Sequence, residues 1–277
     1  MVMVVKWDGR TEEFDPTKIV RTLTRMGAPQ GVAEEIAEDI ADQIEEGMTT
    51  KEVYEMAVDS LEDHKEVVEF RRDLRDGLAR IGSGFRFEEY VRLILQEYGY
   101  KVSGNVVIQG ACVAHEVDSI AERDGETVYV EMKHHSVLAR YTPFEVTLSA
   151  KAKWDDLEAG CKKGLNDCSF DRVLIVTNTR LTKHAQRYAE CVGIEHFGWN
   201  TPRGRGLETF IEKKKLYPVT ILRTITDDER DVLYVNGILT LQQLVKETPK
   251  DTGLSEDRVK ALIEETHRVF TCCQAES

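Results

Sequence analysis

The chain has 277 residues, enough for one large domain or for two to three small ones. Apolar residues make up 41% and charged residues 31%, which is typical of a globular protein with a packed core. No apolar run approaches the roughly 18 residues needed to cross a bilayer, and MVMVVKWDGR lacks a signal-peptide pattern. These features argue against a membrane protein and predict a cytoplasmic one.

The cysteines are scattered and none has CxxC spacing. This pattern argues against a structural zinc site and against a secreted disulfide scaffold, so reduced cytosolic thiols are expected. The six positions are Cys112, Cys161, Cys168, Cys191, Cys272 and Cys273.

The net charge of −13 is unevenly distributed. Residues 1–84 carry −9 (11 basic, 20 acidic), residues 85–217 are neutral (19 of each), and residues 218–277 carry −4 (7 basic, 11 acidic). Because the local field governs polyanion binding, this acidity weakens a nucleic-acid function without excluding it.

The first part of the chain predicts a hairpin followed by helices. Strands at Val2–Trp7 and Thr11–Phe14 flank an Asp8-Gly9 turn, a strong hairpin signal. Asp15-Pro16 then starts a helix that Gly27 ends. The helices that follow are predicted from an apolar i, i+4 row, a Thr49/Glu52 capping box and the segment Glu66–Arg80, before a linker at 81–84. The row is Val32, Ile36, Ile40 and Ile44.

Several segments of this part together resemble the ATP-cone, a nucleotide-sensing domain. They are Val5-Lys6-Trp7-Asp8-Gly9-Arg10, Glu12, Phe14-Asp15, Lys18-Ile19-Val20 and Gly47-Met48-Thr49-Thr50. The resemblance implies binding of ATP or dATP, with Lys6, Arg10 and Lys18 near the phosphates and Thr50 near the nucleotide. Three cations beside a helix N-terminus suit a triphosphate. The alternative is a small α/β unit with surface lysines.

Two details qualify this expectation. Trp7 stands where the ATP-cone usually has a basic residue. The chain has no GxxxxGK[ST] motif, so binding without hydrolysis is expected of this domain.

The second part predicts a mixed sheet flanked by helices, in the order α, three β, α, β, α, β. The run RVLIVT at Arg172–Thr177 is typical of a buried central strand. The predicted helices are Phe85–Tyr98, Glu145–Leu165 and Leu181–Cys191, and the other strands are Lys101–Ile108, Cys112–Ala121, Thr127–Met132 and Ile194–Gly198.

A hairpin in this sheet would bring acidic side chains together. With Asp124-Gly125 as a two-residue turn, Asp118 lies opposite Glu131, and Glu116 lies opposite Lys133. Period-two alternation puts these four charged side chains on one face. Facing carboxylates repel, so they need a counter-charge, which Lys133 or a divalent cation could supply. The alternative is an ordinary solvated strand face.

The stretches Phe87-Glu88, His115-Glu116-Val117-Asp118 and Glu131-Met132-Lys133 resemble the PD-(D/E)xK nucleases, particularly the Mrr-like branch. The resemblance implies Asp118 and Glu131 as ligands of Mg²⁺ (or Mn²⁺), with Glu88 completing the metal shell. Lys133 would orient or activate the attacking water. Val117 replaces the Pro of the family name.

Other polar residues near this motif have less specific readings. We expect the histidines that follow the motif, His134 and His135, to lie at the surface or to face DNA. Five basic residues could follow a phosphate backbone or form a solvated helix face. They are Arg140, Lys151, Lys153, Lys162 and Lys163.

The third part predicts helices at Asp227–Val235, Leu241–Thr248 and Glu256–Phe270. The segments Val235–Leu244 and Thr252–Ser255 resemble a helix-hairpin-helix module, which implies phosphate contacts through backbone amides. The tight G-x-G hairpin is missing, so a protein-interaction or packing role is nearly as well supported.

The sequence thus predicts an α/β (α+β) protein of three domains. These are an ATP-cone at 1–84, a nuclease with a mixed sheet at 85–217 and a small all-α domain at 218–277. The leading hypothesis is a nucleotide-regulated, Mg²⁺-dependent DNA endonuclease, and double-strand cutting would favour a homodimer. The alternatives are a DNA-binding protein that responds to nucleotides without cutting, and a nucleotide-sensing regulator of another protein.

Overall fold

The computed structural model describes residues 2–6, 8–26, 28, 30–63, 65–82, 84–202 and 204–272. The chain divides into two compact units: Met1–Asp73 with His267–Ser277, and Leu74–Thr266. Within the described ranges, no helix combines the length and apolar character needed to span a bilayer.

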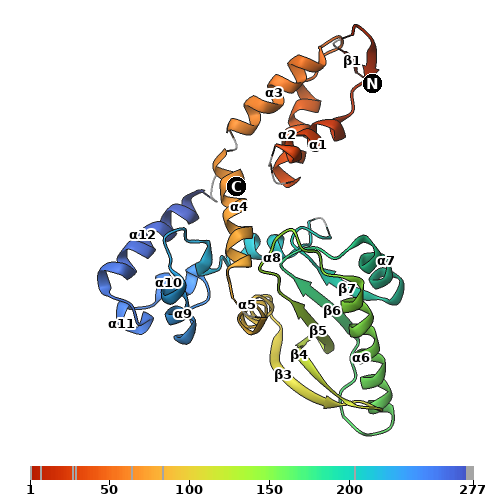
Figure 1. The fold of residues 1–277 in the computed structure, drawn as a ribbon, viewed down its shortest axis with the longest axis vertical. Coiled ribbons are helices and arrows are strands. Elements are labelled where there is room, and N and C mark those ends of the chain that lie inside the picture. Colours follow the sequence, from red (N-terminus) through yellow and green to blue (C-terminus); the bar gives the residue numbers. More distant parts are fainter. Residues whose placement is uncertain are drawn as a thin grey trace. The chain divides into compact units, whose positions relative to one another are not determined.

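The first unit opens with the predicted hairpin. Strands β1 (Met3–Val5) and β2 (Thr11–Glu13) pair antiparallel, with Val4 opposite Glu12. Helices α1 (Pro16–Arg25), α2 (Gln30–Gln43), α3 (Thr50–Asp63) and α4 (Lys65–Ala79) follow (Figure 1). The expected contributions of Trp7 and Gly27 lie outside the described residues.

The predicted helix starts of this unit are confirmed. Asp15 caps α1 by accepting a hydrogen bond of 3.0 Å from Thr17 N. Thr49 and Glu52 form the reciprocal capping box, with bonds of 2.7 and 3.2 Å to each other's backbone N–H groups. Residues of the predicted i, i+4 row, such as Ile36 and Ile40, are buried. Helix α2 therefore contributes its apolar face to the core of this unit.

The second unit is built on a five-stranded sheet in the order β3-β4-β5-β6-β7. Pairing is antiparallel from β3 to β5 and parallel from β5 to β7, so the sheet is mixed as predicted. The strands are β3 (Lys101–Gln109), β4 (Ala114–Arg123), β5 (Glu126–Lys133), β6 (Arg172–Thr177) and β7 (Ile194–Phe197).

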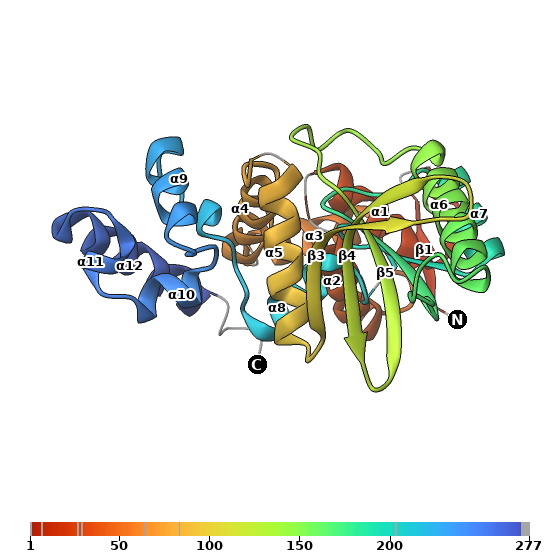
Figure 2. The ribbon, with the colours of Figure 1, turned by 90° about the horizontal axis from the view of Figure 1, so that it is seen from below.

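Helices cover both faces of this sheet (Figures 1 and 2). Helices α6 (Phe144–Lys162) and α7 (Lys183–Val192) pack on one face. Helices α5 (Gly84–Glu97) and α8 (Leu207–Lys214) lie on the other, and α8 was not predicted. Coverage on both sides explains why β6 is a continuous apolar run rather than an alternating one.

The turn between β4 and β5 has the predicted chemistry. Asp124 and Gly125 both have positive φ, 55° and 83°, as a two-residue type I′ turn requires. The pairing runs from Arg123 opposite Glu126 to Ser119 opposite Val130, which confirms the predicted register.

The pairing of β4 with β5 ends at Ser119. The predicted strand pair of Asp118 with Glu131 therefore does not form. The Asp118 carboxylate Oδ2 instead accepts a hydrogen bond of 2.7 Å from the backbone N–H of Met132. On the same face of the hairpin, Ile120 and Tyr129 are buried under α6 and α7. This face is polar only at the open end of the hairpin, away from the turn, where Asp118 and Glu131 lie.

The last part of the chain is helical, as predicted. It contains a short 3₁₀ turn η1 (Val219–Ile221), α9 (Asp227–Val235), α10 (Leu241–Lys246), α11 (Pro249–Thr252) and α12 (Glu256–Cys272). Capping boxes begin α9 at Thr226 and α10 at Thr240. The turns η1 and α11 were not predicted, because each is too short to show helical periodicity.

Candidate active site

The carboxylates of Asp118 and Glu131 repel each other at the point where the pairing of β4 and β5 ends. Burial and the neighbouring charge of Glu131 raise the pKa of Asp118 to about 6, although the hydrogen bond from Met132 N opposes this rise. Both side chains are partly buried. An acid with a raised pKa beside a second acid marks a place where negative charge is in excess.

Glu131 is held by two donors. Lys153 Nζ, from α6, lies 3.0 Å from Glu131 Oε2, and the hydroxyl of Tyr129 donates to the same oxygen. Burial, and then the charge of Glu131, raise the pKa of Tyr129, so its hydroxyl remains a donor. These two donors therefore fix the position of the carboxylate.

Lys153 takes the role that the sequence suggested for Lys133. Its ammonium pairs with Glu131 and lies 3.4 Å from the carbonyl oxygen of Glu116. Lys133 is exposed, and within the described part of the chain it forms no ion pair with either acid. No spacing relation connects residues 131 and 153, so the sequence offered no signal for this pair. The contribution of Tyr129 could have been read from its place two residues before Glu131 on one face.

Glu88 belongs to the same electrostatic cluster. Burial raises the pKa of this α5 residue, Arg92 opposes the rise, and the charges of Glu116 and Glu131 add to it. The guanidinium of Arg92 lies 3.7 Å from Glu88 and donates to the carbonyl of Asp118 at 3.3 Å. Arg92 thus ties the helix that carries Glu88 to the strand that carries Asp118.

The approach of Arg92 depends on a glycine. A Cβ at Gly104 would lie 2.9 Å from Arg92 Nη1, so this position of β3 leaves room for the guanidinium. Without that space, the side chain would have to move away from Asp118 and Glu88.

The donor set suits a hard divalent cation held partly by water. Within the described ranges, no three His, Cys, Asp or Glu side chains lie close enough to hold a metal ion together. Magnesium is commonly bound through one or two carboxylates, with water and substrate phosphates filling the remaining positions. The mutual repulsion of Asp118 and Glu131 is the charge excess that such an ion would neutralise. The side chains of Asp118 and Glu131 are therefore compatible with a bound Mg²⁺ ion.

The two histidines after the motif are not placed as the sequence suggested. His135 is 7% exposed, and its ring nitrogen Nε2 lies 3.0 Å from Thr142 Oγ1. Its backbone exchanges two hydrogen bonds of 2.8 Å with the side chain of Asn178. The prediction of a surface or DNA-facing position for His135 is wrong, because these bonds anchor it within the fold. His134 is half-buried and packs against Phe87, with ring centroids 5.3 Å apart.

The first unit contains a separate cavity of about 200 Å³, lined by Lys18 and Thr50. The other lining residues are Val4, Glu12, Glu13, Phe14, Asp15, Ile19, Thr22, Val53, Tyr54 and Ala57. Two of the four residues assigned to the nucleotide thus line one hollow, between the hairpin, α1 and α3.

The other two residues assigned to the nucleotide, Lys6 and Arg10, differ in how they relate to this cavity. Lys6 and Lys18 both lie 2.8 Å from Glu12 Oε2, so Lys6 is linked to the cavity through a shared carboxylate. The pKa of Glu12 is lowered, first by the hydrogen bond from Lys18 and then by that from Lys6. Arg10 pairs with Asp8 at 2.6 Å and is strongly exposed outside the cavity lining.

Three family models match successive parts of the chain. Residues 2–77 match the ATP cone domain, residues 80–196 match the restriction endonuclease (Mrr catalytic) model, and residues 217–270 match the AF1548-like C-terminal domain. The chain therefore joins an ATP-cone to a nuclease domain of the restriction-endonuclease type. The helix-hairpin-helix resemblance remains a prediction.

Relatives give the family. An uncharacterized protein of Archaeoglobus fulgidus is 36% identical over 180 residues, which span 64% of this chain and 98% of the relative. A crystal structure of a protein of unknown function, AF1548, is 34% identical with a TM-score of 0.57, and the match covers 68% of this chain and 98% of that one. This chain belongs to the AF1548-like family.

A further similar structure is that of Can2 from Sulfobacillus thermosulfidooxidans in complex with cyclic tetra-adenylate. It is 16% identical, with a TM-score of 0.31, and the match covers 41% of this chain and 31% of that one.

Proposed function

We propose that this protein is a DNA endonuclease that requires Mg²⁺ or Mn²⁺ and is regulated by ATP or dATP bound to its first unit. The observation that carries the proposal is the acid pair Asp118 and Glu131, in which burial and mutual repulsion raise the pKa of Asp118 to about 6. Support also comes from the match of residues 80–196 to restriction endonucleases.

In this proposal Asp118 and Glu131 would hold the cation, and Glu88 would complete its shell directly or through water. A bound divalent cation lowers the pKa of water and offsets charge that develops on a phosphoryl group. Lys153 and Tyr129 hold the Glu131 carboxylate in one orientation before any ion arrives. Such preorganisation avoids reorientation at the moment of reaction.

Lys133 is the proposed residue that orients the attacking water. It follows Glu131 by two positions on the same strand, so both side chains project from the same face. Its exposure leaves it accessible to a phosphate that approaches from solvent. Lys153 cannot take this role while it is paired with Glu131.

For the first unit we propose ATP or dATP in the cavity beside Lys18 and Thr50, with Lys6 and Arg10 near the phosphates. Lys6 and Lys18, which share the Glu12 carboxylate, and the start of α1 at Pro16 support an anionic ligand. Only a ligand that binds two conformations with different affinity can regulate the nuclease.

The test is a panel of duplex, branched and single-stranded DNA incubated with Mg²⁺ or Mn²⁺, each with and without ATP and dATP. Metal-dependent cleavage whose rate changes with nucleotide is the expected result. DNA binding at low salt without cleavage under either metal would contradict the proposal and favour a non-cleaving DNA-binding protein instead. Absence of any DNA affinity would favour a regulator of another protein.

A further inference from the structure

Helix α4 extends from one unit of the protein into the other. It is continuous from Lys65 to Ala79, while the boundary between the compact units falls between Asp73 and Leu74. The ATP-cone match ends at residue 77, inside this helix. The last turns of α4 are therefore both the end of the nucleotide-binding domain and part of the unit that contains the acid pair.

These last turns contact the segment that directly follows the motif strand β5. His134 Nε2 lies 3.0 Å from the carbonyl oxygen of Leu78, and Arg75 donates to the carbonyl of Leu138 at 3.2 Å. His134 immediately follows Lys133 in the chain. Two hydrogen bonds from one helix end thus fix both ends of segment 134–138.

The bond from His134 has a defined donor. Burial lowers the pKa of His134, which favours the neutral ring at neutral pH. A carbonyl oxygen can only accept, so Nε2 carries the proton. The carbonyls in the last turn of a helix lack partners within the helix, and here Leu78, whose side chain is fully buried, obtains one from the nuclease fold.

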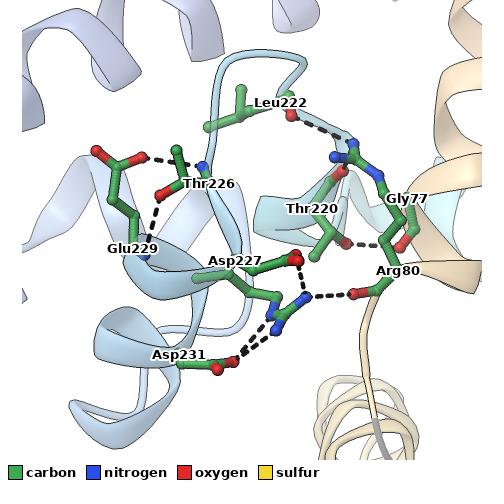
Figure 3. Close-up of polar contacts among 9 residues, drawn as sticks. Gly77, Arg80, Thr220, Leu222, Thr226, Asp227, Glu229 and Asp231 are labelled. Carbon is green, nitrogen blue, oxygen red and sulfur yellow. Dashed lines mark hydrogen bonds and ion pairs between the residues drawn. The ribbon is translucent and has the colours of Figure 1, made fainter.

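The same end of α4 is also fixed to the C-terminal part of the chain (Figure 3). Thr220 Oγ1 donates to the carbonyl of Gly77 at 2.7 Å, and Arg80 donates to the carbonyls of Thr220 and Leu222. Arg230 of α9 donates to the carbonyl of Arg80 at 3.3 Å. The carboxyl end of α4 is therefore bonded to two further segments of its unit.

Close packing leaves this end little freedom. A Cβ at Gly77 would lie 3.0 Å from Ile221 N and 3.1 Å from Ile221 Cα, both backbone atoms. A small rotation or shift of α4 would therefore have to move the 219–222 turn, segment 134–138, or both. Packed interfaces respond to such shifts by changing between discrete arrangements.

We propose that the carboxyl-terminal turns of α4 transmit the nucleotide state of the first unit to the nuclease site. In this arrangement His134 and Arg75 are positioning residues. They hold segment 134–138, which directly follows Lys133 in the chain, against α4. This inference rests on the proposed function, since it names the route by which ATP or dATP would regulate cleavage.

The first test does not depend on cleavage. Hydrogen–deuterium exchange of the full wild-type chain is measured with and without ATP, in the absence of DNA. The inference predicts that ATP changes exchange in residues 65–79 and also in 134–138. ATP binding that changes exchange only within residues 2–63 would overturn the inference and leave the proposed nuclease activity untouched. A chain that does not bind ATP would overturn both this inference and the proposed regulation.

The second test uses variants at the contact. His134→Phe keeps the ring against Phe87 but removes the hydrogen bond to Leu78, whereas His134→Gln keeps a side-chain donor. His134→Phe is expected to bind ATP and to move the ratio of cleavage rates with and without ATP about five-fold toward one, at the low end of typical coupling. His134→Gln is expected to restore part of that ratio.

A second variant and a control keep this test decisive. Arg75→Met removes the bond to Leu138 and is expected to reduce the nucleotide effect in the same direction. Glu122→Gln, an exposed change away from this contact, is expected to leave the ratio unchanged. An unaltered ratio in both His134→Phe and Arg75→Met would overturn the inference. If the wild type shows the predicted exchange changes but cuts no DNA, the coupling stands and the proposed nuclease activity fails.

Discussion

Replacing the half-buried acid Asp118 should stabilise the protein while removing its proposed activity. Asp118→Asn keeps the shape of the side chain and an oxygen that can accept from Met132 N, but removes the charge. In the folded chain the pKa of Asp118 is raised from 3.8 to about 6, first by burial and then by Glu131. The ionised carboxylate therefore destabilises the native state, and a neutral asparagine at this position does not.

The size of this effect follows from the shift. A rise of two pKa units corresponds to about 3 kcal/mol. Partial exposure of the side chain reduces the expected gain to about 1–2 kcal/mol, since solvent screens the charge. For a unit of this size, such a gain raises the Tm by roughly 2–8 °C.

The pH dependence has a definite sign. Between pH 3.8 and about 6 the folded state binds more protons at Asp118 than the unfolded state does, so stability falls as pH rises through this window. The cost of the charge is fully present above pH 6 and absent below pH 3.8. Asp118→Asn should therefore be more stable than wild type at pH 8 and equally stable near pH 4.

The assay is thermal or urea unfolding in EDTA at both pH values, following the transition of the unit that contains the sheet. Glu122→Gln, an exposed carboxylate on the same strand, is the matched control and should change stability little. Adding Mg²⁺ should stabilise wild type more than Asp118→Asn, because only a ligand that binds the native state stabilises it. Equal stabilities at pH 8, or the same gain at pH 4 as at pH 8, would refute the reasoning.

Three further predictions follow from other contacts. Lys153→Met leaves a half-buried carboxylate without its cation and should lower metal-free stability at pH 8 by about 1–2 kcal/mol in urea unfolding; unchanged stability would contradict the ion pair. Lys18→Ala should weaken ATP binding at least about ten-fold by calorimetry, while the exposed Lys51→Ala should not, and equal losses would count against the cavity. Gly77→Ala should destabilise by about 1–3 kcal/mol despite the better helix propensity of alanine, because its Cβ meets the backbone of the 219–221 turn; a gain in stability would show that this turn yields.

Local sequence signals predicted much of the fold. The Asp124-Gly125 turn fixed the register of β4 and β5, because a two-residue turn leaves one pairing that preserves the pleat. Capping residues such as Asp15 and Thr49 marked helix starts, since their side chains satisfy backbone N–H groups within three residues. The acids Asp118 and Glu131 were placed near each other for the same local reason.

The sequence could not predict contacts that depend on tertiary packing. Lys153 reaches Glu131 only because α6 lies across the sheet, and no periodicity links the two positions. The same holds for His134 and Leu78, which are 56 residues apart in the sequence. His135 was misplaced because its burial depends on Asn178, which is distant in the sequence. Helix α8 has only 8 residues, too few to show a clear helical period in the sequence.

The central claim is that Asp118, Glu131 and Lys133 form a metal-dependent nuclease site. Its most direct test is cleavage of supercoiled plasmid DNA by wild type, Asp118→Asn and Lys133→Ala in Mg²⁺, with EDTA and Glu122→Gln as controls. The account predicts nicked or linear product from wild type and Glu122→Gln, none in EDTA, and a loss of at least about 100-fold in the two site variants. Site variants that cut as fast as wild type would contradict it.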